Sequence, residues 1–296
     1  MTSSTPKAPT EPPSFAGPDS NTKKPKFKLP PGAADCHVHV LGPREKYQYS
    51  PARLYTPPDV FLQDYINMLD ALKCDRAVLV QSGIHGVHNE VIVDAIAQYP
   101  DRLRGIALIN ERITDAELDK LAAAGVRGFR ANLHHKIGVQ FDAAKRLAAR
   151  VKRLGWHVQF LLDIEDFPDI DRVLGDYPVE VVIDHMGRPD TRRGTGAPGF
   201  QALLRLLQGG RAWAKLSGPY RKSAGGFPYA DVNPFAHALV ATAPDRLVWG
   251  TDWPHVMLDS PMPNDGDLCD LLAVWVPDAQ VRKQILVDNP QRLYGF

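Results

Sequence analysis

Short apolar runs alternate along most of the chain with longer segments whose apolar residues recur every three or four positions. The short runs are rich in Val, Ile and Leu, which is typical of strands buried in a parallel sheet, and the longer spacing is typical of helices. Strands are predicted at residues 35–40, 76–81, 103–109, 128–132, 157–162, 179–184, 213–217 and 247–250. Helices are predicted at residues 61–72, 115–124, 141–154, 200–207 and 234–241.

This alternation predicts repeated βα units, and eight such units close into a (β/α)₈ or TIM barrel, an α/β fold. The chain of 296 residues has the length of one barrel domain, which we place at residues 29–296. An open doubly wound sheet is the alternative. No glycine-rich phosphate loop follows the first predicted strand, however, and that loop is the usual signature of such a sheet.

Residues 1–28 differ from the rest of the chain because they are rich in Pro, Ser, Thr and Lys and contain no apolar run. Such a segment buries little apolar surface, so we expect a disordered tail and no signal peptide there. No stretch of the sequence approaches the roughly 20 apolar residues that span a bilayer.

The charge balance limits the classes of partner. The 35 basic and 34 acidic residues leave a net charge of +1, which favours neither nucleic acid nor an anionic membrane. A small anionic substrate would need a local basic pocket. The three cysteines, Cys36, Cys74 and Cys269, lack the spacing of a metal site or a disulfide framework, which indicates a reducing, cytoplasmic setting.

Polar side chains stand at the ends of three predicted strands, where TIM barrels carry their catalytic groups. His37 and His39 are two apart on the first strand, so their side chains point the same way. His185 follows the sixth strand and Asp252 follows the eighth. Taken singly, each has a structural explanation, such as a hydrogen-bonded core histidine or a helix cap. Their shared position at strand ends predicts one active site.

The same residues lie in motifs that resemble the amidohydrolase superfamily, in the branch that contains 2-pyrone-4,6-dicarboxylate lactonase, 4-sulfomuconolactone hydrolase and galactarolactone isomerase. The resemblance runs from about Lys28 to Tyr294. Its motifs are PPGAADCHVHVLGP at 30–43, GVRGFRAN at 125–132, DHMGRPD at 184–190 and WGTDWPH at 249–255.

The resemblance implies a hydrolase that opens a small carboxylated lactone similar to 2-pyrone-4,6-dicarboxylate, in aromatic or sugar-acid catabolism. Asp252 would be the general base that takes a proton from the attacking water. His37, His39 and His185 would polarise the lactone carbonyl. The residues expected to bind the substrate are Arg130 and Arg221, as clamps for its carboxylates, with Lys136, Tyr55, Ser82, Arg188 and His255.

Metal dependence is a separate question, because many amidohydrolases hold zinc through the same three histidines and the aspartate. If a metal binds, its ligands would be His37, His39, His185 and Asp252. The fifth strand offers Gln159, Phe160, Leu161 and Leu162 where metal-dependent relatives present a histidine, and the fourth strand has no lysine at its end to bridge two metals. We therefore expect no cofactor, and a single zinc ion is the alternative.

Several positions depart from the dicarboxylate lactonase. Lys136 stands where that enzyme has a second arginine, and Leu161 where it has a tyrosine. Residues 222–223 and 228–232 resemble the isomerase of the branch, although that enzyme has Asn at the position of Asp252. The alternative functions are therefore a sugar-acid lactone isomerase, a zinc-dependent amidohydrolase or decarboxylase, and a non-catalytic binding barrel.

Overall fold

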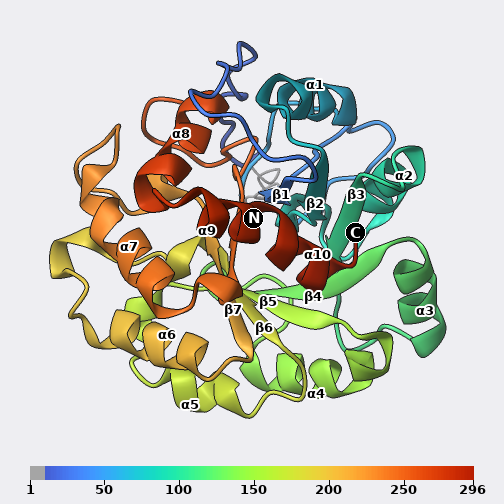
Figure 1. The fold of residues 1–296 in the computed structure, drawn as a ribbon. Helices are drawn as coiled ribbons and strands as arrows, with labels where there is room; N and C mark the ends of the chain where they lie inside the picture. The colour runs from blue at the N-terminus through green and yellow to red at the C-terminus, as the bar shows by residue number, and fades with distance from the viewer. Residues whose placement is uncertain (1–10) are drawn as a thin grey trace, which may run out of the picture.

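All eight apolar runs form strands of one parallel sheet in the computed structural model, which describes residues 11–296 (Figure 1). The strands are hydrogen-bonded in chain order, from the first to the eighth. They are β1 (Ala34–Val38), β2 (Arg76–Val80), β3 (Leu103–Ala107), β4 (Val126–Asn132), β5 (His157–Leu161), β6 (Val181–Ile183), β7 (Ala212–Leu216) and β8 (Leu247–Trp249). The predicted (β/α)₈ fold is confirmed.

The barrel closes between β1 and the residues that directly follow β8. The His39 N–H donates to the Trp253 carbonyl at 2.8 Å, and the Asp252 N–H donates to the His37 carbonyl at 2.9 Å. A Cβ at Gly250 would lie 2.7 Å from the backbone nitrogen of His37, so the close approach of the two chains requires glycine there. This closure sets Asp252 beside the two histidines of β1.

An irregularity in β1 changes the direction of its side chains. Three residue steps from Asp35 to Val38 match only two steps on β2, which is the pattern of a β-bulge. Cys36 packs in an apolar cluster with Trp213 and Tyr294, whereas Val38 packs in the larger cluster that includes the helices. The extra residue thus lets β1 supply both a core side chain and the histidines of the site.

Ten α-helices lie among the described residues, and most of them surround the barrel (Figure 1). Those with predicted counterparts are α1 (Leu62–Leu72), α3 (Asp115–Ala123), α4 (Phe141–Val151), α6 (Pro198–Gln208) and α7 (Asn233–Thr242). Those without are α2 (Glu90–Gln98), α5 (Ile170–Gly175), α8 (Asp265–Trp275), α9 (Ala279–Lys283) and α10 (Asn289–Tyr294). None of the described helices is long and apolar enough to cross a membrane.

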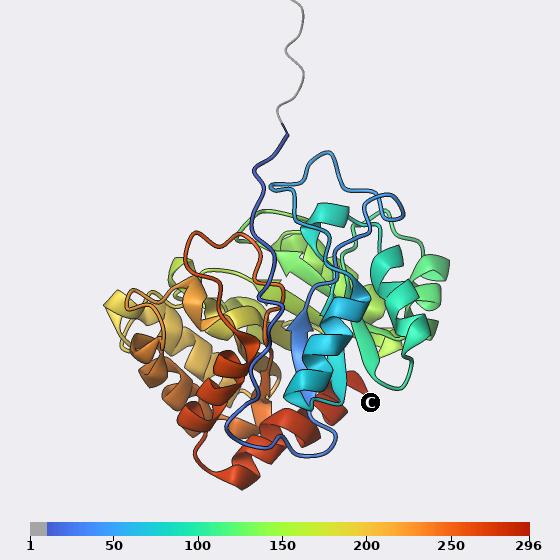
Figure 2. The same ribbon diagram turned by 90° about the horizontal axis from the view of Figure 1, so that it is seen from above.

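Residues 11–28 were expected to be part of a disordered tail, but the structure places them against the barrel. Residues 1–10 of that predicted tail lie outside the described residues. Residues 11–28 run along one side of the barrel, between α1 and α8 (Figure 2). The Lys23 N–H donates to Asn264 Oδ1 at 3.0 Å, and the Lys26 N–H donates to Asp270 Oδ1 at 2.6 Å. The Phe15 ring packs edge-on against Tyr55. Polar side chains at the N-cap and in the middle of α8 therefore bind the backbone of a segment that has few apolar residues of its own.

Candidate active site

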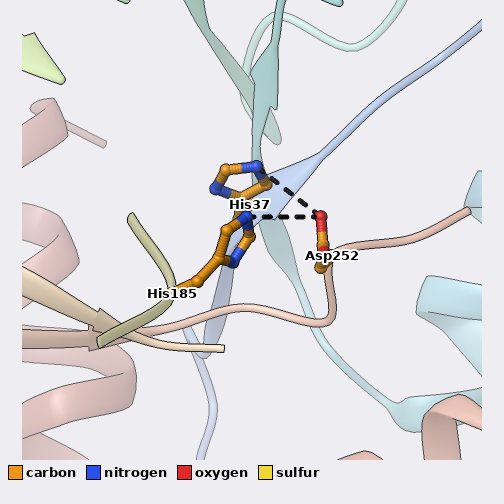
Figure 3. A group of neighbouring side chains, drawn as sticks. All are labelled: His37, His185 and Asp252. Atoms are coloured by element: carbon orange, nitrogen blue, oxygen red, sulfur yellow. Dashed lines mark ion pairs between the residues drawn. The ribbon is translucent and has the colours of Figure 1, made fainter. Parts of the chain in front are cut away.

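Three imidazoles surround one carboxylate oxygen at the carboxyl end of the barrel. Figure 3 shows two of them, His37 and His185, facing Asp252. Asp252 Oδ1 lies 3.7 Å from Nε2 of His37, 3.9 Å from Nε2 of His39 and 3.7 Å from Nε2 of His185. All four side chains are buried. The structure therefore brings together the four residues that the sequence analysis placed at strand ends.

The backbone holds two of these residues in a conformation that L-amino acids rarely adopt. His185 has φ 52° and Asp252 has φ 66°, both in the left-handed region. Such conformations cost roughly 1–3 kcal/mol each and persist where the surrounding structure enforces them. The strain turns both side chains toward the barrel mouth, which is consistent with a functional site.

The second oxygen of Asp252 is fully occupied by donors. Arg221 donates to Oδ2 from Nε at 2.9 Å and lies 2.8 Å away through Nη2, and the Tyr220 hydroxyl donates to the same oxygen at 2.8 Å. Burial opposes ionisation of Asp252, but Arg221 and the neighbouring imidazoles outweigh it and hold the pKa of Asp252 well below its usual value. The carboxylate is therefore ionised at neutral pH and can act as a base through Oδ1.

The imidazoles of the site are neutral at the same pH. Burial, aided by the nearby Arg130 guanidinium, lowers the pKa of His39 to about 4, although Asp252 opposes the shift. Burial likewise lowers the pKa of His185 to about 3 and that of His37 well below its usual value. Neutral imidazoles can hydrogen-bond a substrate without placing further positive charge in the pocket.

A second layer of buried polar groups lies beneath the histidines and centres on Asp184. Arg130 donates to Asp184 Oδ2 from Nε at 3.0 Å, and its Nη2 lies at the same distance. Gln159 Nε2 donates to that oxygen at 3.2 Å. The other oxygen lies 3.2 Å from Nδ1 of His37 and 3.4 Å from Nζ of Lys215. This layer fixes His37 from below.

A pocket opens above these groups, and the residues that line it come from most of the strand-end loops. Its polar lining residues are His39, Tyr55, Ser82, Arg130, Asn132, His135, His185, Arg188, Arg221 and Asp252. Tyr55 and Ser82 share a hydrogen bond of 3.3 Å. Three guanidinium groups thus face the pocket in a protein whose net charge is only +1. They form a local basic pocket suited to a small anion.

The predicted substrate-binding residues are placed in different ways. Arg130 and Arg221 line the pocket, but each also binds a carboxylate of the protein itself. Arg188 lines it too, and donates to Asp163 from Nε at 2.8 Å. Lys136 is exposed and is not among the residues that line the pocket. His255 lies behind the pocket wall, 2.8 Å from the Tyr220 hydroxyl.

Sequence reasoning missed three polar residues that contact the site. Tyr220 binds Asp252, and Asp184 and Lys215 contact His37. Asp184 and Tyr220 stand beside residues that were identified, His185 and Arg221. A lysine in the middle of the apolar run of β7 was the one available signal for Lys215, because lysine is almost never fully buried without a partner.

The donor set also fits one metal ion. His37, His185 and Asp252 offer ligand atoms that all lie within 4.8 Å of one another, and His37 Nε2 and Asp252 Oδ1 lack hydrogen-bond partners among the described residues. A second metal ion does not fit as well, because β5 presents Gln159 and Leu161 at this level. Among residues 11–296 these three form the one group that could hold a metal ion, and their nitrogen and oxygen donors are of the type that zinc accepts.

Known proteins match both the sequence and the fold. The chain is 40% identical over 287 residues to a 2-pyrone-4,6-dicarboxylate hydrolase of Comamonas testosteroni, which covers 93% of this chain and 94% of the relative. It is 38% identical to a 4-sulfomuconolactone hydrolase of Rhizobium radiobacter, with 96% of each chain covered. It is 30% identical to a D-galactarolactone isomerase of Agrobacterium fabrum, with 91% of this chain and 93% of the relative covered.

A solved structure agrees with these relatives. The crystal structure of a probable 2-pyrone-4,6-dicarboxylic acid hydrolase from Acinetobacter baumannii, with citric acid bound, superposes with a TM-score of 0.79. The two chains are 31% identical, and the match covers 90% of this chain and 100% of the other. Residues 34–296 also match the family described as amidohydrolase. The chain with this histidine and aspartate cluster at the mouth of its barrel is a member of the amidohydrolase family.

Proposed function

We propose that the protein hydrolyses a small carboxylated lactone, with Asp252 as the general base. The observation that carries this proposal is the state of Asp252 Oδ1. This oxygen is buried, has no hydrogen-bond partner among the described residues, and faces three imidazole Nε2 atoms. An unpaired buried acceptor costs about 1–3 kcal/mol unless a ligand or water completes it. An attacking water molecule is the species that this position would bind.

The hydrolysis can be written with these groups alone. Asp252 Oδ1 takes a proton from the water while the water oxygen attacks the lactone carbonyl carbon. Imidazole N–H groups of the cluster hydrogen-bond the carbonyl oxygen as it becomes an oxyanion. The intermediate then collapses, the bond from the carbonyl carbon to the ring oxygen breaks, and the proton on Asp252 passes to that ring oxygen. The product is a ring-opened acid, which releases a proton to neutral solution.

The charges of the pocket support an anionic substrate. Arg130, Arg188 and Arg221 line the pocket, while Asp252 is the one acidic residue among its lining residues. Guanidinium groups pair with carboxylates in a planar, two-pronged geometry. The exposed position of Lys136 makes Arg188 a better candidate than Lys136 for the distal anionic group of the substrate. Leu161 lines the same pocket and offers that group only an apolar contact.

We also propose that the reaction needs no metal. The cationic groups around the cluster already include Arg130, Arg221 and Lys215 against the carboxylates of Asp184 and Asp252. A divalent cation would add to an excess of positive charge, which an anionic substrate would otherwise balance. Were a metal to bind through His37, His185 and Asp252, it would supply Lewis-acid polarisation of the carbonyl.

A panel of lactones with and without carboxylate groups, followed with a pH indicator, tests the proposal. Hydrolysis releases protons, whereas isomerisation of a lactone between ring positions does not. The similarity to D-galactarolactone isomerase makes isomerisation the second candidate function. Proton release restricted to carboxylated lactones is the expected result. Conversion of a sugar-acid lactone without proton release would establish the isomerase instead, and turnover of neutral lactones alone would contradict the anionic substrate.

A further inference from the structure

Lys215 is a lysine without solvent exposure inside the barrel, on β7, and the mechanism proposed above does not use it. Its Nζ donates to the Cys36 carbonyl at 2.8 Å and to Gln159 Oε1 at 2.7 Å. It also lies 3.3 Å from His37 Nδ1 and 3.4 Å from Asp184 Oδ1. Burial of a lysine is costly, so its contacts indicate a specific task.

The hydrogens on these groups can be counted. An ammonium group has three hydrogens and no acceptor. Two of them satisfy the Cys36 carbonyl and Gln159 Oε1, and the orientation of Gln159 is fixed because its Nε2 donates to Asp184. The third hydrogen goes to His37 Nδ1, at 3.3 Å. Asp184 Oδ1 lies near both nitrogens but has no hydrogen-bond partner among the described residues, so His37 Nδ1 does not donate to it. Nδ1 of His37 is then an acceptor, and the single hydrogen of the neutral ring must be on Nε2, which faces Asp252.

His39 has the opposite arrangement. Its Nδ1 lies 2.7 Å from the Val80 carbonyl oxygen, which can only accept a hydrogen bond. The hydrogen of neutral His39 is therefore on Nδ1, and Nε2 presents a lone pair to the site. Two histidines separated by one residue on the same strand thus offer different groups: His37 a donor and His39 an acceptor.

We propose that Lys215 is a positioning residue that fixes His37 as the Nε2–H tautomer, so that His37 donates to the substrate carbonyl oxygen while His39 accepts a hydrogen bond from the attacking water. The division of labour rests on the proposed lactone hydrolysis, but the tautomers themselves do not. A metal ion bound at His37 Nε2 would require the opposite tautomer, with the hydrogen on Nδ1.

The tautomers can be measured without any substrate. Protein labelled with ¹⁵N-histidine would be studied by long-range proton–nitrogen NMR, with His37 and His39 assigned from the spectra of His37→Gln and His39→Gln. The expected spectrum shows unprotonated Nδ1 on His37 and unprotonated Nε2 on His39. Unprotonated Nε2 on both rings would overturn the proposal and would indicate that His37 Nδ1 carries the hydrogen and donates to Asp184 Oδ1. This result is independent of whether the substrate is a lactone.

A variant tests the assignment to Lys215 itself. In Lys215→Met the third donor is lost, so His37 should shift its hydrogen to Nδ1 and bind Asp184 Oδ1, at 3.2 Å. Loss of one donor to an oxyanion typically lowers kcat by about 10²–10³ and changes ground-state binding little. We therefore expect that loss in kcat with a nearly unchanged KM, and partial rescue in Lys215→Arg.

A matched control is Trp213→Phe, which alters a buried side chain of β7 that packs in the apolar cluster with Cys36. It should lower the melting temperature and leave both tautomers in place. An unchanged His37 tautomer in folded Lys215→Met would refute the positioning role. Should Lys215→Met fail to fold, the spectrum of the wild-type protein still decides the tautomers.

Discussion

Two buried aspartates lie at the seam between β1 and β8, and they differ in how completely they are hydrogen-bonded. Asp35 accepts from the backbone of Thr251 and His37 through Oδ1, and from the hydroxyls of Thr251 and Tyr65 through Oδ2. Asp252 has all its donors on Oδ2, while Oδ1 has none among the described residues. A buried carboxyl group with hydrogen bonds to both oxygens has a structural role. A buried carboxyl group with one oxygen unbonded has room to bind a ligand or a water molecule.

The two regions also differ in charge. Burial raises the pKa of Asp35 to about 6, and its hydrogen bonds only partly offset this effect. Asp252 is buried to a similar degree, but Arg221 outweighs burial and keeps its pKa low. Burial alone therefore does not decide the ionisation of a carboxyl group in this barrel. A cation in contact with the carboxyl group, present at Asp252 as Arg221, accounts for the difference.

Removing the base should have the largest effect. Asp252→Asn keeps the size of the side chain but removes the proton acceptor, which typically costs about 10²–10⁴ in rate. We expect kcat to fall by that factor while the circular dichroism spectrum stays unchanged. Near-native turnover of a folded variant would contradict the assigned role.

Removing a pocket cation should have the next largest effect. Hydrogen bonds to charged groups contribute roughly 1.5–3 kcal/mol, so Arg130→Met should lower kcat/KM for a carboxylated lactone at least about tenfold. Lys136→Met is the matched control, because Lys136 is exposed and outside the pocket lining. Its kcat/KM should stay within a factor of about two. Equal losses in both variants would show that the pocket assignment is wrong.

Removing Arg221, the cation that Asp252 has and Asp35 lacks, should shift the pH dependence of kcat/KM. In the wild-type protein the acid limb of kcat/KM should lie near pH 4, where His39 with its pKa of about 4 becomes protonated. In Arg221→Met, burial would dominate at Asp252 as it does at Asp35, so its pKa would rise. We expect the acid limb of residual activity to move upward. A limb that stays in place would show that Arg221 does not control this carboxylate.

Asp35 should affect stability and leave the chemistry almost unchanged. A carboxyl group whose folded pKa is raised contributes stability below its unfolded pKa and loses it as pH rises through the folded value. Between about pH 4 and pH 6 the wild-type protein should therefore lose about 2 kcal/mol of this contribution, and Asp35→Asn should not. Urea unfolding of both proteins across that range isolates the difference. Identical pH slopes would contradict a raised pKa.

The smallest effect is expected from chelation. Because we propose a metal-free reaction, dialysis against a strong chelator should leave kcat unchanged, and elemental analysis should find well under one metal ion per chain. Stoichiometric zinc whose removal ends activity, restored by zinc alone, would replace this mechanism with a mononuclear one.

The barrel was predictable from sequence because each strand is a short apolar run, and the observed ends differ from the predicted ends by at most two residues. The helices that were not predicted have no equally clear pattern of apolar residues. α5 has only six residues, and the first turn of α2 contains Val91, Ile92 and Val93, which favour strands on propensity. The histidines and Asp252 were identified because they lie at the carboxyl ends of predicted strands, and those ends can be located from the sequence alone.

The partners of those residues could not be predicted in the same way. Whether Arg221 faces a substrate or Asp252, and whether Lys136 faces the pocket or solvent, depends on the path of loops that no periodicity describes. Lys136 adopts a left-handed conformation at φ 53° in such a loop. The contact between Lys215 and His37 joins residues 178 positions apart and depends on the register of the closed barrel.

The N-terminal segment limits how this barrel can be redesigned. Its backbone pairs with the loop after β1, where the Thr56 N–H donates to the Pro13 carbonyl at 2.9 Å, and its Phe15 packs on Tyr55 in the pocket wall. Farther along, Lys23 binds Asn264, at the end of the loop that follows β8. One strip of chain therefore joins two loops that contribute to the pocket. We expect an exchange of either loop with a relative's loop to succeed only if residues 11–28 are exchanged with it. The two loops and residues 11–28 should therefore be transferred together.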